Sequence, residues 1–264
     1  MARLGSIRRV RGVRRALDAV AASLGLLVFA PILILSSIAV WLQDRGSPLY
    51  VSPRIGRDGV PFRLVKLRSM VIGASDSGVD TTVASDPRVT RVGGMLRRLK
   101  VDELPQLWNV AAGHMALVGP RPNVPREVAR YTPSEREQLT VRPGLTDLAS
   151  IVFADLDKVL AASTDPNGDY GLRIRPWKSR LGLLYVRERG LRLDLEILGL
   201  TLVRAVSRRA SLRGVEAVLT RLEAPADLRR TVHELRDGVA PAAAAAPGGG
   251  SEPGQPAAAL SRGA

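Results

Sequence analysis

The longest apolar stretch of the chain lies near its start, where residues 19–42 read AVAASLGLLVFAPILILSSIAVWL without a charged side chain. A helix over this stretch is about 36 Å long at about 1.5 Å per residue, enough for a bilayer core of about 30 Å. No cleavage-type boundary follows it, so a cleaved signal peptide fits poorly. The pattern predicts a membrane segment. A buried helix of a soluble domain is the alternative.

A proline, Pro31, stands at the middle of this segment, and both flanks are basic. The first fifteen residues hold six arginines and no acid, and Arg45, Arg54 and Arg57 follow the segment. Lys- and Arg-rich flanks stay on the cytoplasmic side, and a proline removes a helical hydrogen bond and bends the helix. We therefore predict a re-entrant anchor, a helix–break–helix that enters the cytoplasmic leaflet and returns. A kinked spanning helix is the alternative.

Beyond the anchor, the apolar pattern changes to that of a small mixed domain. The alternating FRLVKL at residues 62–67, after a turn at Asp58-Gly59, predicts a β-hairpin. Residues 76–86 are polar and contain glycine, which indicates a loop. Helical spacing then places four apolar side chains on one helix face: Val92, Met95, Leu96 and Leu99.

The later segments are mainly helical. TPSEREQLT predicts a capped helix, and RPWKSRLGLLYVRERG a basic amphipathic one; LRLDLEILGLTLVRAVSRRA alternates early, and we interpret it as a helix against the core or the membrane surface. The predicted fold class is α+β, a mostly helical small domain with an N-terminal re-entrant anchor. The predicted organisation is a basic flank (1–15), the anchor (16–43), a cytoplasmic domain (44–213), a helical extension (214–238) and a disordered Ala/Pro/Gly-rich tail (239–264).

Composition narrows the chemistry. The chain carries 39 Lys plus Arg against 25 Asp plus Glu, a formal charge of +14, which implies an anionic partner: nucleic acid, lipid headgroups or a phosphorylated substrate. The absence of cysteine excludes disulfides, thiol catalysis and zinc–thiolate sites. Only two histidines, His114 and His233, are present and far apart, which argues against a histidine triad. Carboxylates, Arg, Lys and a hard metal ion are what remains.

The adjacent acids Asp102 and Glu103 stand out in this basic chain, within LKVDELPQLWN. Pro105 is tolerated only in the first turn of a helix, so a helix starts near Asp102 and the acids are caps in the simplest interpretation. A helix start also keeps a carboxylate ionised, as a nucleophile requires, and its free N–H groups bind phosphate. Two acids can recruit Mg²⁺ together with phosphate oxygens. Both interpretations remain open at this point.

Several motifs occur in a recognisable order: IGRDGVPFRLVKLRSM, DPRVTRVGGMLRRLKVDELPQLWNV, GHMALVGPRP and YTPSEREQLTVRPGLTD. With the apolar, proline-broken start, this order resembles the bacterial sugar transferase family, the monotopic polyprenyl-phosphate phosphoglycosyl transferases. The spacing of DELPQL, GPRP and RPGLT carries most of the resemblance, which spans residues 10–205. The chain resembles the small form, with the catalytic unit alone.

The resemblance implies a reaction. Such enzymes transfer a phosphosugar from a UDP-sugar to a polyprenyl phosphate such as undecaprenyl phosphate and release UMP, at the cytoplasmic face of the bacterial inner membrane. By analogy, Asp102 is the nucleophile and forms an aspartyl-phosphosugar intermediate. Glu103 assists proton transfer or metal placement, and Mg²⁺ lies between these carboxylates and the diphosphate. The family's re-entrant helix is broken at a proline that aligns with Pro31.

The resemblance also assigns supporting roles. Five basic residues occupy the family's motif positions and are expected to bind phosphates or the nucleotide: Lys66, Arg68, Arg88, Arg121 and Arg142. The expected partners are a UDP-sugar, polyprenyl phosphate and anionic membrane lipid, with no nucleic acid. His114 replaces a usual acid, and we interpret it as a surface or packing residue. The rival hypothesis is a non-catalytic, basic, membrane-anchored adaptor that binds anionic lipid, but it gives no reason for DELPQL and GPRP.

Overall fold

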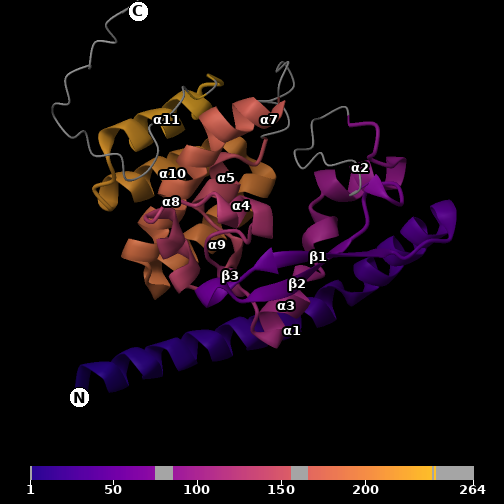
Figure 1. Cartoon of the computed structure of the whole chain (residues 1–264), viewed down its shortest axis with the longest axis horizontal. Coiled ribbons are helices and arrows are strands. Elements are labelled where there is room, and N and C mark those ends of the chain that lie inside the picture. The colour runs from indigo at the N-terminus through magenta and orange to yellow at the C-terminus, as the bar shows by residue number, and fades with distance from the viewer. Residues whose placement is uncertain (1, 75–85, 156–165, 240, 242–264) are drawn as a thin grey trace, which may run out of the picture.

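The computed structural model describes residues 2–74, 86–155, 166–239 and 241. The predicted loop at residues 76–86 and the predicted tail at 239–264 lie almost entirely outside the described residues. Figure 1 shows the long helix α1 running beneath a body made of shorter helices and short strands. The described strands form two separate pairs.

The helix α1 (Ala2–Asp44) is continuous, with Pro31 inside it. The prediction of two helices separated by a break at Pro31 was therefore wrong. The ribbon instead bends as a single helix (Figure 1), as expected where a proline removes one hydrogen bond while its neighbours persist. Residues 12–44 are long and apolar enough to cross a membrane.

The predicted hairpin is present. Strand β1 (Leu49–Ile55) pairs antiparallel with β2 (Pro61–Leu67), so that Arg54 lies opposite Phe62. In the turn η1 (Arg57–Gly59), Asp58 and Gly59 have φ of 59° and 78°. These left-handed conformations suit Asp-Gly and match the twist of the two strands.

The predicted helix near residue 92 is α2 (Arg91–Arg98), which begins where the Thr90 side chain accepts a hydrogen bond from the Gly93 amide. Lys100 then adopts a left-handed conformation, with φ of 58°, and the chain turns there after α2. The short helix η3 (Val101–Glu103) and the helix α3 (Gln106–Ala112) follow. The acidic pair therefore lies in the corner between α2 and α3.

A parallel strand pair was not predicted. Strand β3 (Ala116–Val118) pairs with β4 (Gly144–Thr146). Glycines permit this approach, because a Cβ atom on Gly144 would lie only 2.1 Å from the backbone nitrogen of Gly119. The GPRP and RPGLT motifs are thus side by side. In the sequence, α4 (Pro125–Ala129) and η4 (Glu135–Thr140) lie between these two motifs. The helix predicted for TPSEREQLT is η4, which is a 3₁₀ helix.

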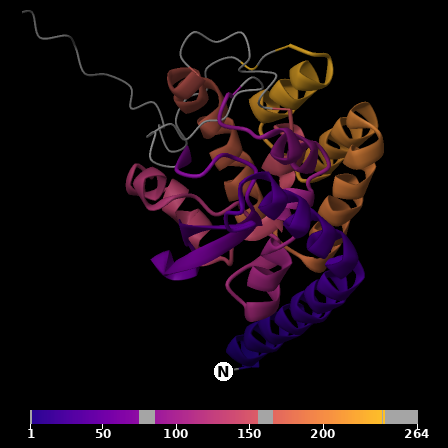
Figure 2. The ribbon, with the colours of Figure 1, turned by 90° about the vertical axis from the view of Figure 1, so that its right-hand side faces the viewer.

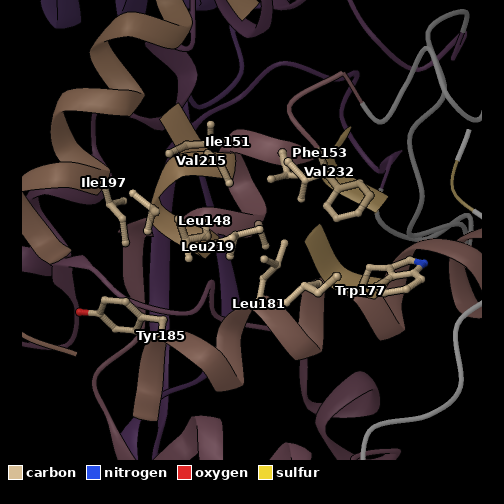
Figure 3. Packing of buried hydrophobic residues seen from close by; sticks show 14 of the residues in the cluster. Leu148, Ile151, Phe153, Trp177, Leu181, Tyr185, Ile197, Val215, Leu219 and Val232 are labelled. Carbon is tan, nitrogen blue, oxygen red and sulfur yellow. The ribbon is translucent and has the colours of Figure 1, made fainter. Parts of the chain in front are cut away.

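Helices from the second half of the chain enclose the main core. They are α5 (Leu148–Val152), α7 (Pro166–Asp169), η5 (Tyr170–Ile174), α8 (Arg175–Glu188), α9 (Leu191–Val206), α10 (Arg208–Arg221) and α11 (Ala226–Arg236). Figure 3 shows Leu148 and Leu219 side by side within this core, with Ile197 to their left and Leu181 below them. The boundary predicted at residue 213 falls inside α10, which packs its apolar face into this core.

The helix α1 packs on the domain through small contacts along one face. Ala22 joins Leu107 and Val110 of α3 in one cluster, and Val40 joins Leu67 in another. The opposite face of α1 stays apolar and exposed, including Leu27 at 74% and Val28 at 69%. Viewed from the right-hand side of Figure 1, α1 lies along one edge of the body (Figure 2). Apolar side chains on such an outer face are typical of a helix in contact with lipid.

Candidate active site

The helix α3 is fixed against the hairpin by a buried amide. Asn109 accepts a hydrogen bond from the Val65 amide at 3.0 Å and donates one to the carbonyl of Arg63 at 2.7 Å. These bonds hold the Asp102–Glu103 corner next to β2, the strand that carries Lys66. The asparagine in the LPQLWN motif therefore positions the acidic pair.

Glu103 is the centre of an ion network. Its carboxylate accepts from Lys66 Nζ at 3.1 Å and from both terminal nitrogens of Arg121 at 2.8 and 3.0 Å. Arg121 also donates to the carbonyl of Leu145 in β4 at 2.9 Å. Burial opposes charge on Glu103, but the positive charges of Arg121 and Lys66 outweigh burial and hold its pKa well below its usual range. Glu103 is therefore ionised and bound on both oxygens.

Asp102 has the opposite environment. It is 6% exposed, and its buried Oδ1 has no hydrogen-bond partner among the described residues. Burial raises its pKa, although the nearby Lys66 charge opposes this. The capping interpretation was wrong, since neither η3 nor α3 has a side-chain cap. The sequence also led us to expect that the helix start keeps Asp102 ionised, but its pKa is raised instead.

A second buried group that has no partner among the described residues follows one helical turn later. Gln106 is fully buried, and neither atom of its side-chain amide has a hydrogen-bond partner in the described parts of the chain. Unsatisfied buried groups are rare and commonly mark a site completed by a ligand or ion. Oxygen atoms of a carboxylate and an amide are suitable ligands for Mg²⁺. Within the described ranges no cluster of three acidic, histidine or cysteine side chains offers a complete metal cage.

A cavity of about 210 Å³ lies next to the dyad. Lys66 and Arg121, the two cations bound to Glu103, line it, whereas Asp102 and Glu103 lie behind them. Its remaining lining includes charged, aromatic and amide side chains: Arg54, Asn123, Glu127, Tyr131, Gln138, Asp147, Tyr170, Arg175 and Lys178. Cations outnumber acids on this wall, so the cavity favours an anionic occupant.

The predicted phosphate-binding residues divide into two groups. Lys66 and Arg121 meet at Glu103 and line the cavity. The other three form ion pairs away from it. Arg68 pairs with Asp44 at 2.6 Å, Arg88 with Asp86 at 2.6 Å, and Arg142 with Asp18 at 3.6 Å. Their roles in phosphate binding stay predictions.

Other side chains show what the sequence could and could not indicate. His114 is exposed and stacks on Phe62 with ring centroids 5.9 Å apart, which agrees with a surface or packing role. Arg54, Gln106 and Lys178 were not recognised as site residues. Their only signal was a place in the SPRIG, DELPQL and RPWKS segments, and many other basic residues have a similar one.

The amino-acid sequence of the chain is similar to those of known proteins. Residues 9–208 match the family described as bacterial sugar transferase. A UDP-glucose:undecaprenyl-phosphate glucose-1-phosphate transferase from Caulobacter vibrioides is 43% identical over 141 residues, 52% of this chain and 53% of that protein. An undecaprenyl-phosphate glucose phosphotransferase from Komagataeibacter xylinus is 38% identical over 211 residues, 74% of this chain and 36% of that protein.

The relatives differ in the sugar that their names specify. A UDP-N-acetylgalactosamine-undecaprenyl-phosphate N-acetylgalactosaminephosphotransferase from Aeromonas hydrophila is 34% identical over 151 residues, 55% of this chain and 36% of that protein. The chain spans about half the length of the curated relatives it matches.

Proposed function

Because the chain belongs to the bacterial sugar transferase family, we propose that it transfers a phosphosugar from a UDP-sugar to a polyprenyl phosphate such as undecaprenyl phosphate. The named relatives act on undecaprenyl phosphate, and two of the names specify the UDP-sugar. The product would be the first lipid-linked sugar of a bacterial surface polysaccharide or glycoconjugate.

One observation carries the proposal: a buried carboxylate without a partner lies beside a carboxylate that is fully bound. Asp102 Oδ1 has no hydrogen bond among the described residues, while Glu103 holds Lys66 and Arg121 at the wall of the cavity. An unpartnered buried oxygen costs free energy. It is retained where it meets a reacting group, as a carboxylate nucleophile does.

The reaction would proceed in two displacements. An oxygen of Asp102 attacks the sugar-bearing phosphorus, the bond from that phosphorus to the bridging oxygen breaks, and UMP leaves with the electron pair. The phosphate oxygen of the lipid then attacks the same phosphorus and releases Asp102. Lys66 and Arg121 would turn from Glu103 toward the diphosphate and balance its charge. Glu103 would keep both cations placed between turnovers.

A magnesium ion fits the groups present. Asp102 Oδ1 and the amide of Gln106 are unpartnered in the described residues, and Mg²⁺ commonly uses one or two protein oxygens plus phosphate oxygens. When bound, it would neutralise charge on the diphosphate. Asp102 would hold it, with Gln106 or Glu103 as the second protein group.

The contacts of α1 support a monotopic arrangement at the cytoplasmic face. Arg15, just before the apolar segment, donates to the carbonyls of Val110 and Ala111 at 3.0 and 2.6 Å. At the end of α1, Asp44 pairs with Arg68. These two positions, on either side of the apolar segment, are about 44 Å apart along a helix, yet both contact the same domain. A helix that crossed the bilayer would have one end on the far side, so we propose that α1 enters and leaves by the same leaflet.

The first test of the function is replacement of Asp102. Asp102→Asn keeps the volume of the side chain but removes the nucleophile, so we expect UMP release to fall about a thousandfold or more. The assay uses the full chain in lipid nanodiscs, with undecaprenyl phosphate, Mg²⁺ and a panel of UDP-sugars. Asp58→Asn, at the exposed hairpin turn, is the matched control and should keep its activity.

The same assay separates the adaptor hypothesis. A non-catalytic adaptor would release no UMP with any sugar, while both variants would still be recovered with membranes. An Asp102→Asn protein with the activity of the control would contradict the assignment of the nucleophile.

A further inference from the structure

Two basic side chains in the cavity, Arg54 and Lys178, make no hydrogen bond or ion pair with an acid among the described residues, and the nearest acidic influence is the charge of Asp147 on Lys178. Lys66 and Arg121 are bound to Glu103, and Arg175 pairs with Glu135 at 3.1 Å. In contrast, Arg54 and Lys178 make no hydrogen bond or ion pair with any residue in the described ranges, and the Nε atom of Arg54 is buried. Both residues are half-buried, and a cation that loses water without gaining an ion pair is costly, so a cavity that keeps two of them is suited to an anion.

The two cations come from different parts of the fold. Arg54 lies on β1 of the hairpin and Lys178 on α8 of the helical core, and both line the cavity. Lys178 lies over the ring of Tyr170 at 5.2 Å, which limits the region that its ammonium group can reach. The positive charge of Arg121 lowers the pKa of both Arg54 and Lys178. Arg121 therefore lies near both of them, on the side of the dyad.

We propose that Arg54 and Lys178 form a second anion subsite, which binds the phosphate that leaves with the nucleoside when Asp102 attacks. This inference rests on the proposed function. In this arrangement Lys66 and Arg121 face the sugar-bearing phosphate that Asp102 attacks. Arg54 and Lys178 face the phosphate attached to the nucleoside. When the bond to the bridging oxygen breaks, the electron pair stays on that oxygen, and the leaving phosphate gains one negative charge. The two cations meet this charge, and no proton transfer is required.

Binding of the product tests the subsite without turnover. The full chain in nanodiscs is titrated by calorimetry with UMP, with inorganic phosphate and with uridine. Arg54→Gln and Lys178→Gln should each weaken UMP and phosphate binding about tenfold or more, since a hydrogen bond to a charged group is lost. Uridine, which has no phosphate, should bind all proteins equally.

Matched controls lie on the same elements. Arg57→Gln is at the tip of the hairpin and Arg187→Gln is on the exposed side of α8, where these side chains are 50% and 60% exposed. Both should bind UMP as the unaltered chain does. Lys178→Arg and Arg54→Lys keep the charge and should restore most of the affinity, which separates the subsite from a loss of folding. Thermal unfolding is recorded for every variant.

The outcomes distinguish this inference from the proposed function. Failure of the unaltered chain to release UMP from any UDP-sugar would overturn the function. The inference fails if Arg54→Gln and Lys178→Gln bind UMP as tightly as the controls. It also fails if uridine binding weakens as much as UMP binding, because the two side chains would then contact the nucleoside.

Discussion

Two sets of basic side chains in this molecule look alike in the sequence and differ in the structure. In one, Arg68 and Arg142 each pair with an aspartate of α1, and Arg88 pairs with Asp86, two residues before it. In the other, Arg54 and Lys178 line the cavity and make no hydrogen bond or ion pair with an acid in the described residues. The first set is neutralised by direct ion pairs, whereas the second set has only the nearby charge of Asp147, which acts on Lys178. Pairing therefore distinguishes two sets of basic residues that the motifs do not distinguish.

Among the substitutions that test this difference, removal of the Glu103 carboxylate is expected to reduce the rate of transfer most. Glu103→Gln leaves Lys66 and Arg121 without their anion, so transfer should fall about a hundredfold as the two cations lose their placement. Affinity for UMP should stay the same or rise, because the freed cations add to the charge of the cavity. Turnover and calorimetry measure the two effects. A parallel loss of both would show that Glu103 merely maintains the fold.

Removal of Arg68 tests the set of basic residues that form ion pairs with aspartates. Arg68→Gln removes the bidentate pair with Asp44 and the bond to the carbonyl of Ser47 at 2.7 Å. The end of α1 would then loosen from the hairpin, so the Tm should fall while affinity for UMP stays unchanged. Differential scanning calorimetry and UMP titration provide the two readouts. A tenfold loss of UMP affinity with an unchanged Tm would move Arg68 into the substrate-binding set.

Titration of Lys178 gives a smaller and more specific effect. Burial lowers the pKa of Lys178 to about 8, and Arg121 and Lys100 act in the same direction while Asp147 opposes them. Burial raises the pKa of the facing Tyr170 to about 12, so that group stays neutral. UMP affinity should therefore fall as pH rises through about 8, because the ammonium group loses its proton. Lys178→Arg should remove this decline.

The same pKa sets the sign of a stability effect. Between pH 8 and the ordinary lysine range near pH 10.5, the unfolded chain binds the proton that the folded chain has lost. Stability therefore gains a contribution from Lys178 as pH rises through this window. Urea unfolding of the unaltered chain and of Lys178→Gln measures this contribution as the difference between two pH profiles. An identical pH dependence in both proteins would contradict the lowered pKa.

Local patterns predicted the local structure well. The Asp58-Gly59 turn, the helix at residues 91–98 and the helices α8 and α9 follow from turn chemistry and apolar periodicity, which involve neighbouring residues. The strands β3 and β4 were missed because each has three residues, too few for an alternating pattern. They also pair across distant parts of the sequence.

The site was predicted in part for the same reason. The position of Asp102, Glu103, Lys66 and Arg121 around one corner agrees with the motifs. The partners of Arg68 and Arg142 lie on α1, far from them in sequence, so no local pattern shows that these charges are neutralised. Burial that raises the pKa of Asp102 is likewise a product of packing. Charge balance depends on the fold as a whole.

Isolation of the covalent intermediate tests the central claim most directly. The full chain in nanodiscs is incubated with a UDP-sugar labelled in the sugar, without lipid acceptor, and the protein is digested and analysed by mass spectrometry. The account predicts a sugar-phosphate adduct on the peptide that contains Asp102, absent in Asp102→Asn and discharged by undecaprenyl phosphate. UMP release that requires both substrates together, with no adduct on the protein, would contradict it.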